Sequence, residues 1–174
     1  MKNPSTRRSF LKGAAAGIVL PAGAISIARA YPANTKVRHA ACGVTGMGGY
    51  DLRMLSASPH SEIVGLCDID DGHLGSVAKK FPKAARYNDF RKMFDAMGKD
   101  IDAVSVSTPD HAHFHPSVAA LQLGKHLYCE KPMAHSVEEV RIMTDLARKQ
   151  KVATQLGVQR HTIGNVHRVV ELIQ

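Results

Sequence analysis

The 174-residue sequence has few cysteines and no apolar run long enough to cross a bilayer comfortably. The three cysteines, Cys42, Cys67 and Cys129, lie within or at the ends of apolar, strand-like runs. An odd, buried-looking set argues against the disulfide framework of a small secreted domain, so we expect the cysteines to pack in a core. Internal repeats and low-complexity stretches are absent after residue 30, and the length suggests one domain of ordinary size.

Acidic residues are missing from the first 30 positions. Residues 6–12, TRRSFLK, match a twin-arginine export motif. A weakly apolar run at 13–27 and the A-x-A cleavage pattern at 28–30 follow it. The first cysteine is Cys42, too far from that pattern for a lipoprotein. We therefore predict that residues 1–30 are a signal peptide, with no stable membrane anchor, and that the protein is periplasmic or secreted.

The predicted signal peptide, called the leader below, accounts for much of the net positive charge. It carries five of the 23 basic residues and none of the 15 acidic ones, so its removal lowers the formal charge from +8 to +3. The high isoelectric point is therefore partly a property of the leader, and it does not indicate nucleic-acid binding. The five residues are Lys2, Arg7, Arg8, Lys12 and Arg29.

From Lys36 onward, short apolar runs alternate with helical patterns. Alternating strands and helices predict an α/β domain over 36–160, a doubly wound parallel sheet (Rossmann) in the order 3-2-1-4-5-6. The helix signals include an N-cap at Asn88 and a capping box from Ser136 to Glu139. One helix is expected to carry Leu74, Val77, Ala78 and Phe81 on one face. The expected strands are 37–42, 63–67, 84–87, 101–107, 126–129 and 152–157.

A glycine-dense turn, Gly43 to Gly48, joins the first strand to a helix. Such a turn lets the backbone approach a pyrophosphate at the helix N-terminus. The pattern is imperfect, because Thr45 replaces the middle glycine and Gly46 follows it. Asp68, 25 positions after Gly43, ends the second strand and is expected to bind a ribose hydroxyl. No arginine follows closely, so NAD is favoured over NADP; the alternative is that Asp68 caps a helix.

Polar clusters follow four of the expected strands, at the sheet edge where such folds bind ligands. The first two clusters are the glycine turn and Asp68, and the other two lie at 107–111 and 130–132. We predict these cofactor-binding residues: Gly43, Thr45, Gly46, Met47, Gly48, Asp68, Ser107, Thr108, Pro109, His111, Glu130, Lys131 and Pro132.

Three histidines alternate at 111, 113 and 115, a spacing that suggests a metal site. Alternate residues share a face only in a strand, and Pro116 marks this segment as a loop that enters a helix. We therefore predict no metal site. His113 and His115 are expected to pack in the loop and helix entry, and His111 to face the cofactor.

The glycine turn, the CDID of 67–70, the STPDHxH of 107–113 and the EKP of 130–132 together resemble the glucose–fructose oxidoreductase and inositol dehydrogenase (Gfo/Idh/MocA) family. The leader looks like that of its exported branch. The resemblance implies an NAD(P)-dependent oxidoreductase that transfers hydride between the nicotinamide and a sugar or cyclitol. Lys131 is then the candidate catalytic acid or base, or alternatively a surface lysine paired with Glu130.

The resemblance also implies a second α/β domain that supplies substrate contacts, a catalytic histidine and the interface of a homo-oligomer. The chain ends at Gln174 inside an expected helix, so we expect 161–174 to begin a truncated second domain or a linker helix. The 174 residues alone are then expected to be inactive. Two alternatives stay open: an NAD-dependent, redox-neutral glycosidase of the same fold, and a non-catalytic nucleotide-binding fragment.

Overall fold

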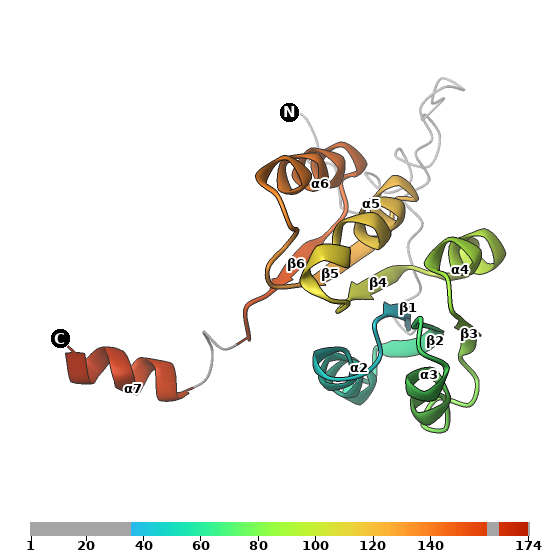
Figure 1. Ribbon diagram of the computed structural model, residues 1–174, viewed down its shortest axis with the longest axis horizontal. Coiled ribbons are helices and arrows are strands. Elements are labelled where there is room, and N and C mark those ends of the chain that lie inside the picture. The colour runs from blue at the N-terminus through green and yellow to red at the C-terminus, as the bar shows by residue number, and fades with distance from the viewer. Residues whose placement is uncertain (1–35, 160–163, 174) are drawn as a thin grey trace, which may run out of the picture. The chain divides into compact units, whose positions relative to one another are not determined.

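The computed structural model describes residues 36–159 and 164–173, in which six strands form one parallel sheet (Figure 1). The sheet order is β3-β2-β1-β4-β5-β6, so the predicted order is confirmed. The expected leader, residues 1–30, lies outside the described residues. The strands are Val37–Cys42 (β1), Ser61–Cys67 (β2), Ala85–Tyr87 (β3), Ala103–Val106 (β4), His126–Glu130 (β5) and Thr154–Gly157 (β6).

Helices connect the strands, and short 3-10 turns at Gly98–Asp100 and Asp110–Ala112 precede β4 and α5. Within the described part of the chain, no helix has both the length and the apolar character to span a membrane. The helices are Met47–Ala57 (α2), Asp71–Ala78 (α3), Phe90–Met97 (α4), Phe114–Gln122 (α5), Val137–Gln150 (α6) and Gly164–Ile173 (α7).

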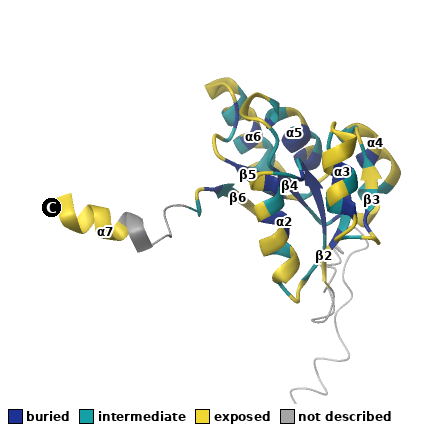
Figure 2. Cartoon of the chain, turned by 60° about the horizontal axis from the view of Figure 1, so that its bottom comes forward, coloured by how far each residue is buried: buried dark blue, intermediate teal, exposed yellow. Residues whose placement is uncertain are grey.

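Helices cover both faces of the sheet, as neighbouring residues of β1 show. Ala40 belongs to a buried cluster with side chains of α4, α5 and α6, whereas Ala41 belongs to a second cluster with α2 and α3. Successive side chains of a strand point to opposite faces. The helices α2 and α3 therefore cover one face and α4, α5 and α6 the other. Figure 2 shows the buried residues gathered in the central strands and on the helix sides next to them.

The expected N-cap of α4 is wrong by one residue. Asp89 caps this helix by accepting a hydrogen bond from the Arg91 N–H at 2.9 Å. The Asn88 amide instead donates to the carbonyl oxygen of Asp68 at 3.1 Å and to the carboxylate of Asp71 at 2.7 Å. The Asn88 side chain therefore holds the loop that follows β2.

The predictions for the capping box, the apolar face of α3 and the cysteines agree better with the structure. The capping box of Ser136 and Glu139 is present at the start of α6. The helix α3 ends at Ala78, before Phe81, yet Phe81 still packs against the expected cluster. All three cysteines are buried and unpaired, and burial raises the pKa of the Cys129 thiol to about 11. Their predicted role in the core is confirmed.

The glycine turn brings the start of α2 against the ends of β1 and β4. Gly43 has a φ of +83°, and a β-carbon there would lie 2.5 Å from the carbonyl oxygen of Ser107. At Gly48, a β-carbon would overlap the carbonyl group of Gly43. Gly43 and Gly48 are therefore required by close backbone contact.

Replacing Gly48 with alanine should lower the free energy of unfolding by about 1–3 kcal/mol, the usual cost of forcing an extra carbon into a packed site. Gly75→Ala is the matched control, because Gly75 lies within α3 and an added β-carbon meets no atom within 4 Å. Removing a helical glycine there should raise stability by up to about 1 kcal/mol. Urea denaturation followed by circular dichroism measures both. Equal effects of the two changes would contradict the close contact.

Candidate functional site

A groove of about 710 Å³ lies at the carboxyl ends of β1, β2 and β4, and we call it the strand-end groove. Nine of the predicted cofactor-binding residues line it: Gly43, Thr45, Gly46, Met47, Asp68, Ser107, Thr108, Pro109 and His111. The four predicted residues that do not line it are Gly48, Glu130, Lys131 and Pro132.

The N-terminus of α2 opens into this groove without a side-chain cap. Gly46 stands at the N-cap position, no side chain accepts from the first-turn amides, and the first turn carries no acidic residue. A β-carbon at Gly46 would meet no protein atom within 4 Å, so the backbone here is open to close approach by a ligand. Free amides and the helix dipole together favour an anion at this point.

Asp68 is fixed at the rim of the groove by backbone hydrogen bonds. Its Oδ2 accepts from the Val44 N–H at 3.1 Å, and its Oδ1 accepts from the Asp70 N–H at 3.0 Å. A carboxylate has about four acceptor positions, so two bonds leave it able to accept from hydroxyl groups of a ligand. The N-cap of α3 is Asp70, which accepts from the His73 N–H at 2.8 Å. The alternative role of Asp68 as the helix cap is therefore wrong.

The loop after β4 forms the opposite wall. The Ser107 hydroxyl donates to the Asp51 carboxylate of α2 at 2.7 Å, and burial raises the pKa of Asp51. The hydroxyl oxygen of Thr108 is buried, and among the described residues it has no hydrogen-bond partner. Because Thr108 lines the groove, this hydroxyl is available to a polar group of a ligand.

Eleven further described residues line the groove that were not predicted to bind the cofactor, among them Ile69, His73, Asn88, Phe90 and His115. Ile69 is 91% exposed although it is apolar. Its place directly after Asp68 was a usable signal. His73 could have been predicted as a lining residue only with the correct start of α3. Asn88 and Phe90 could have been predicted only with the correct start of α4.

The Glu130-Lys131-Pro132 segment lies outside the groove, at the end of the neighbouring strand β5. Glu130 is buried, and its carboxylate accepts from the Tyr128 hydroxyl at 3.1 Å, the Gln159 amide at 2.9 Å and the Lys131 N–H at 3.3 Å. Lys131 and Pro132 are exposed. Among the described residues no ion pair joins Lys131 to Glu130, so the alternative of a surface pair finds no support.

His113 connects the loops after β4 and β5. It is buried, and its Nδ1 lies 2.6 Å from the carbonyl oxygen of Pro132 while its Nε2 lies 2.7 Å from that of Thr108. Both ring nitrogens are thereby occupied, so His113 cannot share a metal ion with His111 and His115. Within the described ranges, no three His, Cys, Asp or Glu side chains gather as metal ligands would.

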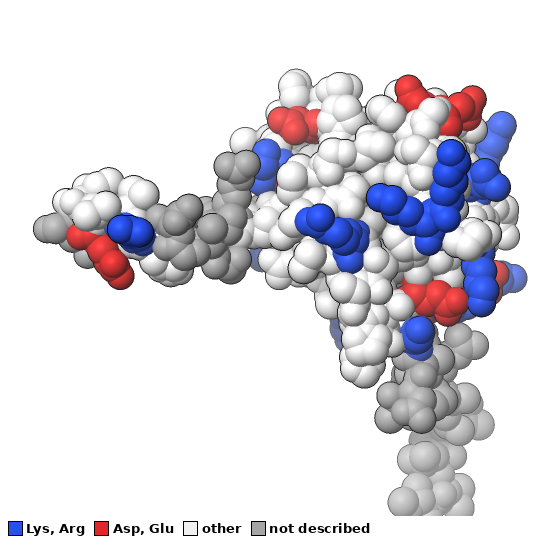
Figure 3. Space-filling model, turned by 90° about the horizontal axis from the view of Figure 1, so that it is seen from below, with Lys and Arg blue, Asp and Glu red and all other residues white. Residues whose placement is uncertain are grey.

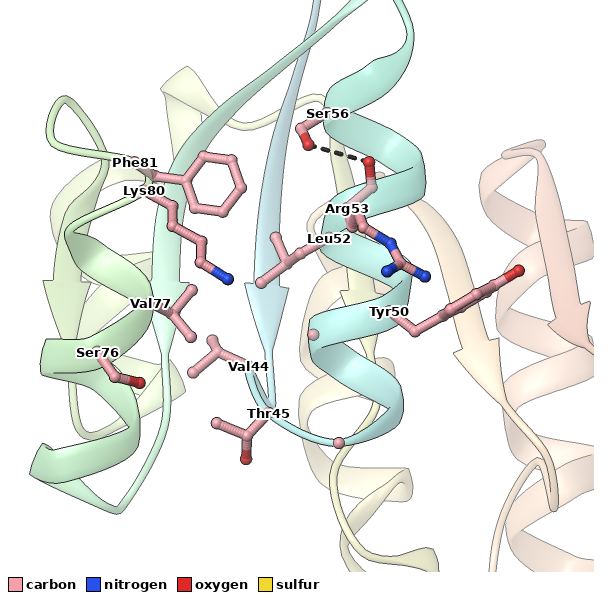
Figure 4. Close-up of a pocket in the computed structure, with 12 residues that line it drawn as sticks. Val44, Thr45, Tyr50, Leu52, Arg53, Ser56, Ser76, Val77, Lys80 and Phe81 are labelled. Carbon is pink, nitrogen blue, oxygen red and sulfur yellow. Dashed lines mark hydrogen bonds between the residues drawn. The ribbon is translucent and has the colours of Figure 1, made fainter.

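A second groove, of about 640 Å³, lies between α2 and α3 (Figure 4). It shares Val44, Thr45 and Gly46 with the strand-end groove, but neither Asp68 nor the loop after β4 lines it. Arg53 packs over the Tyr50 ring at 5.2 Å on its wall. Figure 3 shows lysine and arginine side chains scattered over the face of α2 and α3. This second groove therefore includes part of the glycine turn but not the Asp68 carboxylate that a ribose would need.

The chain is similar to several known dehydrogenases. Glucose-6-phosphate 3-dehydrogenase of Bacillus subtilis is 32% identical over 137 residues, 75% of this chain and 37% of that protein. Inositol 2-dehydrogenase of Salmonella typhimurium is 32% identical over 124 residues, 68% of this chain and 36% of that protein. The crystal structure of the WlbA dehydrogenase from Chromobacterium violaceum in complex with NADH and UDP-GlcNAcA matches with a TM-score of 0.66 and 25% identity, covering 72% of this chain and 36% of that one.

The chain thus spans about a third of the length of the relatives it matches. The family model described as "Oxidoreductase family, NAD-binding Rossmann fold" matches residues 37–158, which include the whole sheet and all nine predicted residues that line the strand-end groove. The chain therefore belongs to the Gfo/Idh/MocA oxidoreductase family and carries its NAD-binding Rossmann fold.

Proposed function

We propose that the strand-end groove binds NAD in preference to NADP. One observation carries the proposal: the uncapped N-terminus of α2 and the fixed carboxylate of Asp68 lie in one groove at the carboxyl ends of parallel strands. The amides of the helix start suit a pyrophosphate, and a carboxylate suits ribose hydroxyls but repels a 2′-phosphate. The open backbone at Gly46 and the unpaired Thr108 hydroxyl fit a ligand on the same path.

The whole protein's activity that this site would serve is the oxidation or reduction of a sugar or cyclitol. The support comes from the family and from the relatives named above, whose substrates are glucose 6-phosphate and inositol by name. Bound NAD would supply the hydride acceptor. Lys131 would exchange a proton with the substrate hydroxyl, because an exposed lysine at the end of β5 stands one strand from the groove. The buried Glu130 carboxylate holds the Lys131 backbone at 3.3 Å.

Replacing Asp68 with alanine should weaken NAD binding by about 1.5–3 kcal/mol, the usual worth of a hydrogen bond to a charged group. Asp68→Asn keeps an acceptor for the Val44 N–H but removes the negative charge. It should therefore reduce the difference in affinity between NAD and NADP. Asp145→Ala is the matched control and should leave NAD binding unchanged, because Asp145 is an exposed residue of α6 that does not line the groove. Isothermal titration calorimetry with both dinucleotides measures these effects. Tighter binding of NADP than of NAD to the unaltered chain would refute the assignment.

We also propose that residues 1–30 direct export through the twin-arginine route, on the sequence pattern described above. Replacing Arg7 and Arg8 with lysine should keep the protein in the cytoplasm, because the paired arginines are the recognised feature. Mass spectrometry of exported material should find Tyr31 at the N-terminus. Export with Met1 intact, or export of the double-lysine variant at the normal level, would show that the leader is misassigned.

A further inference from the structure

His73 stands beside the carboxylate that is expected to hold the ribose. It lies on the first turn of α3 and lines the strand-end groove. Its Nδ1 lies 3.3 Å from the hydroxyl oxygen of Thr45 and 3.9 Å from Oδ1 of Asp68. The side chain is 55% exposed, so solvent and ligands both reach it. The imidazole therefore stands between the glycine turn and the acid, at the rim of the groove.

The charges around this imidazole are acidic. Asp68 and Asp70 precede it in the loop, and the pKa of Asp70 is lowered, chiefly by its hydrogen bond from the His73 N–H. The other titratable groups that line the groove are Cys42 and Cys67, both buried at the strand ends, and His111 and His115 on the loop after β4. No lysine or arginine is among the described residues that line the groove. A histidine is thus the only type of side chain here that can supply a positive charge.

We propose that His73 sets the choice between NAD and NADP according to its charge. When the imidazole is neutral, no positive charge offsets the repulsion between the Asp68 carboxylate and a 2′-phosphate, so NAD is preferred. With a protonated imidazole, a positive charge beside Asp68 offsets that repulsion and attracts the phosphate, so NADP becomes acceptable. Histidine side chains ordinarily change charge between pH 5 and 8. The inference rests on the proposed binding of NAD in this groove and adds a pH-dependent cofactor specificity to it.

The test is the ratio of the dissociation constants for NADP and NAD, measured by titration calorimetry on the chain at about pH 6 and about pH 8, on either side of ordinary histidine titration. The ratio should fall about fivefold at the lower pH, as expected for one partly exposed charge pair. His73→Gln should keep the high ratio at both values. His73→Lys, which stays charged, should give the low ratio at both.

His60→Gln is the matched control, because His60 is exposed and lies just before β2, at the opposite edge of the sheet from the groove. A phosphate also gains a proton near pH 6, so each variant is compared with the unaltered chain at the same pH. The inference would be overturned if the ratio of the NADP and NAD dissociation constants did not change with pH. It would also be overturned if that ratio changed equally in His73→Gln. Neither result would affect the proposed binding of NAD. Failure of NAD to bind at either pH would instead overturn the proposed function, and the inference with it.

Discussion

The contact between Gly48 and the carbonyl group of Gly43 is the constraint on which the site depends. It allows α2 to begin after a turn of only four residues from the end of β1, so that Gly46 and Met47 at its N-terminus line the strand-end groove. The same turn presses Gly43 against Ser107, so the loops after β1 and β4 meet without a side chain between them. The Val44 N–H then binds Asp68 and joins the loop after β2 to this arrangement. These contacts join the three loops after β1, β2 and β4, all of which line the groove.

A second set of polar contacts extends from this turn to the end of β5. The Ser107 hydroxyl binds Asp51 on α2, and the His113 ring joins the carbonyl groups of Thr108 and Pro132. Asp51 is only 4% exposed, and this burial raises its pKa. The segment that carries Lys131 is therefore tied to the wall of the groove, although it does not line it. This is a physical reason to treat the groove and the lysine as parts of one site.

Much of the fold could be predicted from the sequence, because the strands are separated by strong helix signals and the parallel order follows from their alternation. The start of α4 could not, since Asn88 and Asp89 are both good caps and only tertiary contacts assign Asn88 to the loop after β2. The predicted site residues account for nine of the twenty described residues that line the groove. Glu130 shows what a motif does not contain: its carboxylate is buried and accepts hydrogen bonds from Tyr128 and Gln159, while its contact with a cofactor stays a prediction. The direction in which a side chain points depends on neighbours that a motif does not contain.

The central claim is that NAD occupies the strand-end groove and not the groove between α2 and α3. Backbone amide chemical shifts, followed by nuclear magnetic resonance as NAD is added, test it most directly. The account predicts that the largest shifts fall on Gly46, Met47, Ile69, Thr108 and His111, with small ones at Ser56, Lys80 and Phe81. Shifts concentrated at the latter three residues, with none at Met47 or Ile69, would contradict it.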